Sequence, residues 1–186
     1  MGPCWRGFNV TPLLQNALTA HQDGNLKLAQ SLYECILKGE PKNLDAILLL
    51  GVLFAQVGES EQVVALMKRA IKINDRLEAA HYNLGVAYIK LKQFGFATKA
   101  LMRAVELSPN NFDALIALAN SYLGEKEFEL ASDIYRKCLE LQPENSGIWN
   151  DRALPLRNLG RLDEALDAYN RAIHLNPQNF EAHSNK

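Results

Sequence analysis

The sequence repeats itself every 34 residues. Matched positions share size and polarity, without insertion or deletion, across the segments 10–43, 44–77, 78–111, 112–145 and 146–179. Residues 180–186 begin the same pattern again, so we expect five full repeats, the start of a sixth, and a leader of residues 1–9 outside the repeats. A period of this length is typical of arrays in which each repeat buries its apolar surface against the next. The chain is therefore restricted to a repetitive fold.

Each repeat contains two helical segments. In residues 78–111 the apolar positions recur at spacings of three and four, first at Leu84, Ala87, Tyr88 and Leu91, and then at Phe94, Ala97, Leu101 and Ala104. Lys92 and Gln93 form a turn so short that the two helices are expected to lie antiparallel. Pro109 ends the second helix, and the asparagines after it favour capping of the next one. The predicted fold class is all-α, an α-solenoid of antiparallel helix pairs.

Columns of small and large residues predict the core. The eighth position carries Ala17, Gly51, Gly85, Ala119 and Ala153, and the twentieth carries Ala29, Val63, Ala97, Ala131 and Ala165. The twenty-fourth position carries the larger Tyr33, Met67, Leu101, Tyr135 and Tyr169. Small residues let helix backbones approach closely, and large ones fill the space between them. We expect all three columns to be buried.

These residues resemble a known family. Leu84, Gly85, Tyr88, Ala97, Leu101 and Pro109 are similar to the tetratricopeptide repeat pattern, with His81 in the place of the family's tryptophan and Trp149 supplying it in the fifth repeat. The resemblance covers residues 10–186 and implies a right-handed superhelix whose first helices line a concave face. Phrases such as GRLDEALDAYNRAIHLNP also resemble repeats of bacterial O-GlcNAc-transferase-like proteins. Those proteins use asparagines at the sixth position, where this chain has only Asn83 and Asn185.

The same resemblance implies which residues bind a partner. In the family, the second, fifth, ninth, twelfth and thirteenth positions face the concave groove. Carried over, the candidate partner-binding residues include Leu14, Leu18, Leu48, Val52, Tyr82, Val86, Ile89, Lys90, Ile116, Asn120, Asn150 and Leu154. This surface is largely apolar and turns polar at Asn120 and Asn150, and an exposed apolar strip usually marks an interaction site. The alternative for any one residue is packing against a neighbouring first helix.

A terminal-carboxylate clamp is not expected. Chaperone-tail receptors of this family hold a carboxylate with Lys, Arg and Asn at the second, fifth and sixth positions. In the first four repeats these positions carry no cation, and acids occupy two of them, Asp45 and Asp113. The groove is therefore predicted to bind by another chemistry.

No catalytic, cofactor or metal site is predicted. The histidines are His21, His81, His174 and His183, and no two have the i, i+4 spacing of a helical metal site. His81 and His183 share one column, which favours a structural role. Glycines stand singly, so no phosphate-binding loop is present. Cys4, Cys35 and Cys138 form no CxxC motif and are interpreted as reduced thiols, the last two packed in second helices.

Charge and hydropathy exclude further classes of partner. The net charge is −1 and the basic residues are dispersed, so no nucleic acid partner is expected. The apolar run 46–55 is about half the length of a membrane span, so no membrane partner is expected. The first residues do not look like a secretory signal, which predicts a cytoplasmic location.

Three functions remain open. The first is a non-catalytic scaffold that binds a partner peptide or protein in the groove. The second is the substrate- or partner-selecting region of a larger enzyme such as an O-linked glycosyltransferase. The third is self-association through an uncapped C-terminal end.

Local departures from the pattern add two expectations. Pro155 within a first helix predicts a kink. Trp5 and Phe8 either pack on the first repeat or belong to a leader without fixed structure.

Overall fold

The computed structural model describes residues 10–178 and 180–186, and its regular structure within these ranges is entirely helical. The leader 1–9, with Trp5 and Phe8, lies outside the described residues. The chain divides into two compact units, residues 1–91 and residues 92–186. The division falls within the segment 78–111, between its two helices. None of the helices in the described ranges is both long enough and apolar enough to span a bilayer.

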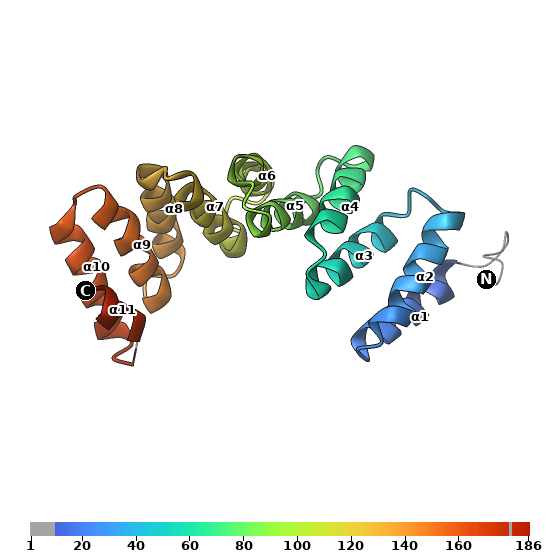
Figure 1. The fold of residues 1–186 in the computed structure, drawn as a ribbon, viewed down its shortest axis with the longest axis horizontal. Coiled ribbons are helices and arrows are strands. Elements are labelled where there is room, and N and C mark those ends of the chain that lie inside the picture. Colours follow the sequence, from blue (N-terminus) through green and yellow to red (C-terminus); the bar gives the residue numbers. More distant parts are fainter. Residues whose placement is uncertain (1–9, 179) are drawn as a thin grey trace. The chain divides into compact units, whose positions relative to one another are not determined.

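Unit 1 contains five helices in its described part (blue to green in Figure 1). They are α1 Val10–Gln22, α2 Leu26–Gly39, α3 Leu44–Val57, α4 Ser60–Ile73 and α5 Glu78–Lys90. Each helix packs against the next one along the chain. Tyr33, Ile36, Leu50 and Leu53 are buried at the centre of its core, together with alanines of the small columns.

Unit 2 contains the remaining helices of the described chain (green to red in Figure 1). They are α6 Phe94–Leu107, α7 Phe112–Glu125, α8 Phe128–Leu141, α9 Ser146–Asn158, α10 Leu162–Leu175 and the short α11 Phe180–Asn185. Consecutive helices again pack together. One core cluster lies around Leu115 and Tyr135, and another around Leu156 and Tyr169. In this unit α7 and α9 thus each pack on the helix before and on the helix after.

The period of the sequence sets where first helices begin. They start at Val10, Leu44, Glu78, Phe112, Ser146 and Phe180, at intervals of 34 residues. The predicted asparagine caps are confirmed: the side chains of Asn43, Asn111 and Asn145 accept hydrogen bonds from the backbone N–H groups of Ala46, Ala114 and Ile148 at 3.0, 3.0 and 3.2 Å. Each bond satisfies a donor that the first helical turn leaves without a partner.

The turn between paired helices has a left-handed residue at the same repeat position each time. Gly24, Gly58 and Gly160 have φ angles of 76°, 84° and 74°, and Lys92 and Lys126 have φ angles of 57° and 63°. Glycine adopts this conformation without steric cost, whereas a residue with a side chain does not. The two lysine turns therefore hold strain that the glycine turns avoid.

The small columns are buried as predicted. Every residue at the eighth and twentieth positions belongs to the buried class. At Gly51 the absent side chain leaves room for the end of Met67, which a Cβ atom would meet. A second close approach is between Gly124 on α7 and the ring of Phe94 on α6. Close helix approach therefore depends on small residues at these positions.

Pro155 lies inside α9 and is fully buried. The helix is continuous from Ser146 to Asn158, so proline does not interrupt it. Only three helical residues follow Pro155, which limits how much of the helix a lost hydrogen bond affects. The kink stays a prediction.

Candidate functional site

The predicted partner-binding residues are divided between the two units. Unit 1 carries Leu14, Leu18, Leu48, Val52, Tyr82, Val86, Ile89 and Lys90 on α1, α3 and α5. Unit 2 carries Ile116, Asn120, Asn150 and Leu154 on α7 and α9. We call these two sets the first-helix face of unit 1 and the first-helix face of unit 2. Each is considered by itself.

Polar contacts join the first helices of unit 1 side by side. His21 Nε2 on α1 lies 2.9 Å from Gln56 Oε1 on α3, within hydrogen-bonding distance. Lys90 Nζ on α5 donates to the carbonyl of Ala55 on α3 at 3.4 Å. Both contacts involve the C-terminal halves of these helices. The predicted residues of unit 1 therefore lie on neighbouring helices of one layer.

The fifth and ninth repeat positions differ in exposure. Leu14 and Ile116, at the fifth position, are half-buried and pack against the hydrophobic cores of their units. Val52 and Leu154, at the ninth position, are 38% and 39% exposed. Leu18 and Val86, also at the ninth position, are half-buried. Each unit thus has one exposed apolar side chain among the predicted residues, Val52 in unit 1 and Leu154 in unit 2.

Asn120 is held by a tyrosine of the paired helix. Tyr135 on α8 donates its hydroxyl hydrogen bond to Asn120 Oδ1 at 2.7 Å. Burial raises the pKa of Tyr135, with the charge of Asp151 adding to the effect, so the hydroxyl stays protonated. The amide oxygen of the exposed Asn120 accepts this bond, and its amide nitrogen carries two donor hydrogens of its own.

A second polar group connects α9 and α11. Asn185 Nδ2 donates to Asn150 Oδ1 at 3.3 Å, and Asn150 Nδ2 donates to Asp151 Oδ1 at 3.4 Å. Asn150 is only 7% exposed, so it positions its neighbours more than it offers a contact surface. Burial raises the pKa of Asp151, the Asn150 hydrogen bond opposes the shift, and the charge of Glu181 adds to it. Sequence reasoning placed Asp151 in the sixth column but did not recognise it as a site residue.

Tyr169 has the same repeat position as Tyr135 but no corresponding acceptor. Its hydroxyl is buried and has no hydrogen-bond partner among the described residues. The position that holds Asn120 in the fourth repeat holds Leu154 in the fifth. The Tyr169 hydroxyl lacks a partner in the described chain because Leu154, unlike Asn120, has no acceptor atom in its side chain.

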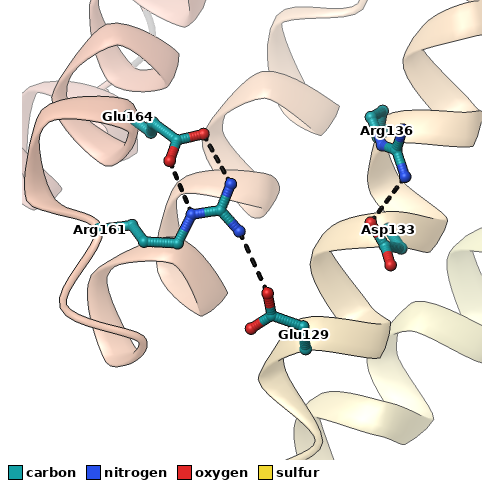
Figure 2. A network of polar contacts seen from close by, with 5 residues as sticks. All are labelled: Glu129, Asp133, Arg136, Arg161 and Glu164. Atoms are coloured by element: carbon teal, nitrogen blue, oxygen red, sulfur yellow. Dashed lines mark hydrogen bonds and ion pairs between the residues drawn. The ribbon is translucent and has the colours of Figure 1, made fainter.

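Ion pairs gather instead around the second helices of unit 2 (Figure 2). Arg161, just before α10, makes two hydrogen bonds to Glu164 at 2.7 and 2.8 Å and reaches Glu129 on α8 at 3.4 Å. Arg136 pairs with Asp133 within α8 at 2.8 Å. These side chains are exposed, so each pair contributes little to stability. They give this side of the unit a charged surface unlike that of the first-helix face.

His81 and His183 have the structural role that their shared column favoured. The fourth repeat position directs a ring nitrogen at the carbonyl six residues earlier: His81 at Asp75, Trp149 at Pro143 and His183 at Pro177, at 2.9, 2.8 and 3.2 Å. The two histidines replace the tryptophan as partners of a loop carbonyl. In the described ranges no group of three or more His, Cys, Asp or Glu side chains is placed to hold a metal ion.

Cys138 on α8 is a free thiol. Cys138 is fully buried, and burial raises its pKa to about 11. The thiolate is the reactive form, so this thiol is unreactive at neutral pH. Cys35 is half-buried within α2.

Solved structures share this fold. The crystal structure of MamA matches with a TM-score of 0.87 at 23% identity, over 91% of this chain and 92% of that chain. YrrB, described as a TPR protein with an unusual peptide-binding site, matches with a TM-score of 0.88 at 19% identity, over 95% of this chain and 91% of that chain. MamA 41-end from Desulfovibrio magneticus RS-1 matches with a TM-score of 0.86 at 17% identity, over 97% and 99%. At these identities the likeness concerns the fold.

Comparison of sequences identifies the family. No curated protein matches the chain in sequence. Family models described as tetratricopeptide repeat match residues 78–111, 112–145 and 134–167, and one described as TPR repeat matches residues 156–186. Together these matches span more than half of the chain, and with the paired helices at a 34-residue interval they show that the protein belongs to the tetratricopeptide repeat family.

Proposed function

We propose that this protein is a non-catalytic interaction scaffold whose first-helix faces bind a segment of a partner protein. The observation that carries the proposal is the exposed apolar ninth position, occupied by Val52 in unit 1 and by Leu154 in unit 2. Neither residue belongs to the buried core of its unit. Val52 lies one helical turn after the half-buried Leu48 on α3, and apolar surface on the first helices of a repeat array is typical of a contact surface.

The partner we propose is an extended or helical segment that binds mainly by burying apolar surface. Burying apolar surface contributes roughly 25 cal/mol per Å², reduced by the cost of ordering the bound segment. Within each unit the fifth and ninth positions place side chains on two or more first helices, which fits a segment that lies across them. The fold likeness to YrrB, which is described as having a peptide-binding site, supports this interpretation.

A peptide selection tests the proposal. A phage-displayed library of random dodecapeptides is selected on the immobilised full chain, and the most enriched sequence is synthesised with a fluorescent label. Fluorescence anisotropy then compares Val52→Glu and Leu154→Glu with Leu130→Glu, whose parent residue is 45% exposed on the second helix α8.

A charge placed against an apolar ligand costs at least about tenfold in affinity. We therefore expect one of the first-helix substitutions to weaken binding by that factor, while Leu130→Glu leaves it unchanged. Failure to enrich any peptide, or equal weakening by Leu130→Glu, would contradict the proposal.

A further inference from the structure

Asp151 is a partly buried carboxylate without a cationic partner. Among the described side chains no Lys, Arg or His forms an ion pair with it. The groups that influence it are the Asn150 amide and the carboxylate of Glu181, and one of these is a like charge. Charges that are removed from water are normally paired, because an unpaired one is costly to desolvate. The protein by itself thus leaves a negative charge that another molecule can neutralise.

A second partly buried charge on α9, Arg152, is likewise outside the ion pairs of the described residues, and its Nε is buried without a hydrogen-bond partner there. Unlike Asp151, it has opposite charges near it, Glu164 and Asp133, although Arg161 and Arg136 oppose their effect. The surface ion pairs of Arg161 with Glu164 and Glu129 are formed within the unit. The ion pairs in the described part of unit 2 thus join exposed side chains of the second helices and the turn before α10, and Asp151 takes part in none of them.

The surroundings of Asp151 are held in place by hydrogen bonds. The contact from Asn185 to Asn150 and then to Asp151 connects α11 with α9. Tyr135, whose pKa responds to the charge of Asp151, holds the exposed Asn120 on α7 by a hydrogen bond to its amide oxygen. An acceptor carboxylate and a donor amide are thus presented by neighbouring first helices, and sites positioned in this way lose little entropy on binding.

Apolar and acidic residues complete the surface. Ile116 and Leu154 belong to the same face, and Leu154 is 39% exposed. Asp113 and Glu181 add negative charge near the N-terminal ends of α7 and α11. A negatively charged surface attracts cations and raises their local concentration.

We propose that the first-helix face of unit 2 binds an extended segment of another protein that carries a lysine or arginine flanked by apolar residues, with the cation paired to the Asp151 carboxylate. This inference rests on the proposed scaffold function and specifies its partner. Asn120 donates to the main chain of the segment, and the flanking apolar side chains pack on Ile116 and Leu154. A charge-assisted hydrogen bond in a partly desolvated site is expected to improve affinity by about tenfold.

Peptide selection on matched variants tests the cation pairing separately from the scaffold function. The random dodecapeptide library is selected in parallel on the wild-type full chain, on Asp151→Asn and on Asp167→Asn. Asp167 lies exposed on the second helix α10, so it controls for the loss of one negative charge. We expect wild type and Asp167→Asn to enrich peptides with one basic residue between apolar residues, and Asp151→Asn to lose the basic preference.

A double-mutant cycle then measures the interaction between Asp151 and the basic residue of the peptide. The most enriched peptide is synthesised with its basic residue and with norleucine at that position, and both are titrated against the three proteins by fluorescence anisotropy. Norleucine is expected to weaken binding about tenfold to wild type and to Asp167→Asn, and to change binding to Asp151→Asn little.

Four results would overturn the inference. Enrichment of apolar peptides without a basic residue, or an equal norleucine effect in Asp151→Asn, overturns the cation pairing and leaves the scaffold function standing. Failure of every protein to enrich peptides overturns both. A dimer of the wild type in light scattering that dissociates in Asp151→Asn identifies a second copy of the chain as the occupant and also overturns the inference.

Discussion

Tyr135 donates a 2.7 Å hydrogen bond to Asn120, and this pair joins the core of a helix pair to its first-helix face. The tyrosine lies 15 residues after the asparagine. One repeat later the same spacing connects Tyr169 with Leu154, and the Tyr169 hydroxyl is buried without a partner among the described residues. Two tyrosines in equivalent positions therefore differ in one hydrogen bond, which makes them a natural comparison.

Removing the two hydroxyl groups is expected to have opposite effects. Tyr135→Phe removes a formed hydrogen bond and should lower the free energy of unfolding by about 1 kcal/mol. Tyr169→Phe removes a buried hydroxyl that lacks a partner and should raise it by up to about 1 kcal/mol. Urea unfolding followed by circular dichroism measures both. Equal destabilisation by the two substitutions would show that the Tyr169 hydroxyl is satisfied in solution.

Leu154→Asn is expected to supply the acceptor that Tyr169 lacks. The substitution reproduces the Asn120 and Tyr135 pair one repeat later, and the gain is about 1 kcal/mol. Leu154 is 39% exposed, so its loss removes little buried apolar area. The same substitution in a Tyr169→Phe background is the control and should give no gain. Stabilisation that persists in that background would have another cause.

The helical pairs were predictable from the sequence because their determinants are local and periodic. Small residues at the eighth and twentieth positions recur in all five repeats and are buried as expected. Asparagine caps three of the first helices, and a ring nitrogen at the fourth position bonds a loop carbonyl in three repeats. The left-handed turns at Lys92 and Lys126 could also have been found, because both share a column with Gly24, Gly58 and Gly160.

The candidate site was less predictable, because exposure depends on packing between helices. Repeat position alone treats Leu14 and Val52 as equivalent groove residues, yet Leu14 packs against the core and Val52 is exposed. The partial burial of Asp151 likewise depends on Asn150 and its neighbours on α11. The division at residue 91 has no sequence signal, because it falls in the most regular of the repeats.

Gly124→Ala is expected to destabilise unit 2. A Cβ atom there would clash with the ring of Phe94, which cannot move aside as a flexible chain end can. Overpacking of this kind costs about 1–3 kcal/mol. Gly95→Ala is the matched control, because its Cβ atom would lie 3.4 Å from the end of the Glu125 side chain and alanine favours the helix. Rescue of Gly124→Ala by Phe94→Leu, measured by thermal unfolding, would identify the ring as the cause.

The left-handed turns predict a pair of opposite effects. Gly58→Ala places a side chain at a φ of 84° and should lower the free energy of unfolding by about 1 kcal/mol. Lys126→Gly removes a side chain at a φ of 63° and should raise the free energy of unfolding by a few tenths to about 1 kcal/mol. The gain is limited because glycine also gives the unfolded chain more conformational entropy. A Cβ atom at Gly58 meets nothing within 4 Å, so the backbone angle alone is tested. Destabilisation by Lys126→Gly would show that the lysine turn is not strained.

Asp151→Asn is expected to stabilise the protein near neutral pH and to lose this advantage in acid. Burial raises the pKa of the Asp151 carboxyl in the folded state, the charge of Glu181 adds to the rise, and the Asn150 hydrogen bond opposes it. The unfolded chain therefore releases this proton first as the pH rises, so ionised Asp151 lowers the free energy of unfolding above its folded-state pKa. The penalty disappears below the ordinary pKa of aspartate, at about pH 3.

Urea unfolding of wild type and Asp151→Asn at pH 3 and pH 7 measures this dependence, with Asp167→Asn as the control for losing an exposed charge. The asparagine variant should be the more stable at pH 7 and indistinguishable from wild type at pH 3. A lower stability of Asp151→Asn at pH 7 would mean that the folded chain already compensates the carboxylate. In that case the charge is not left for a partner, and the proposed pairing with a basic side chain loses its physical basis.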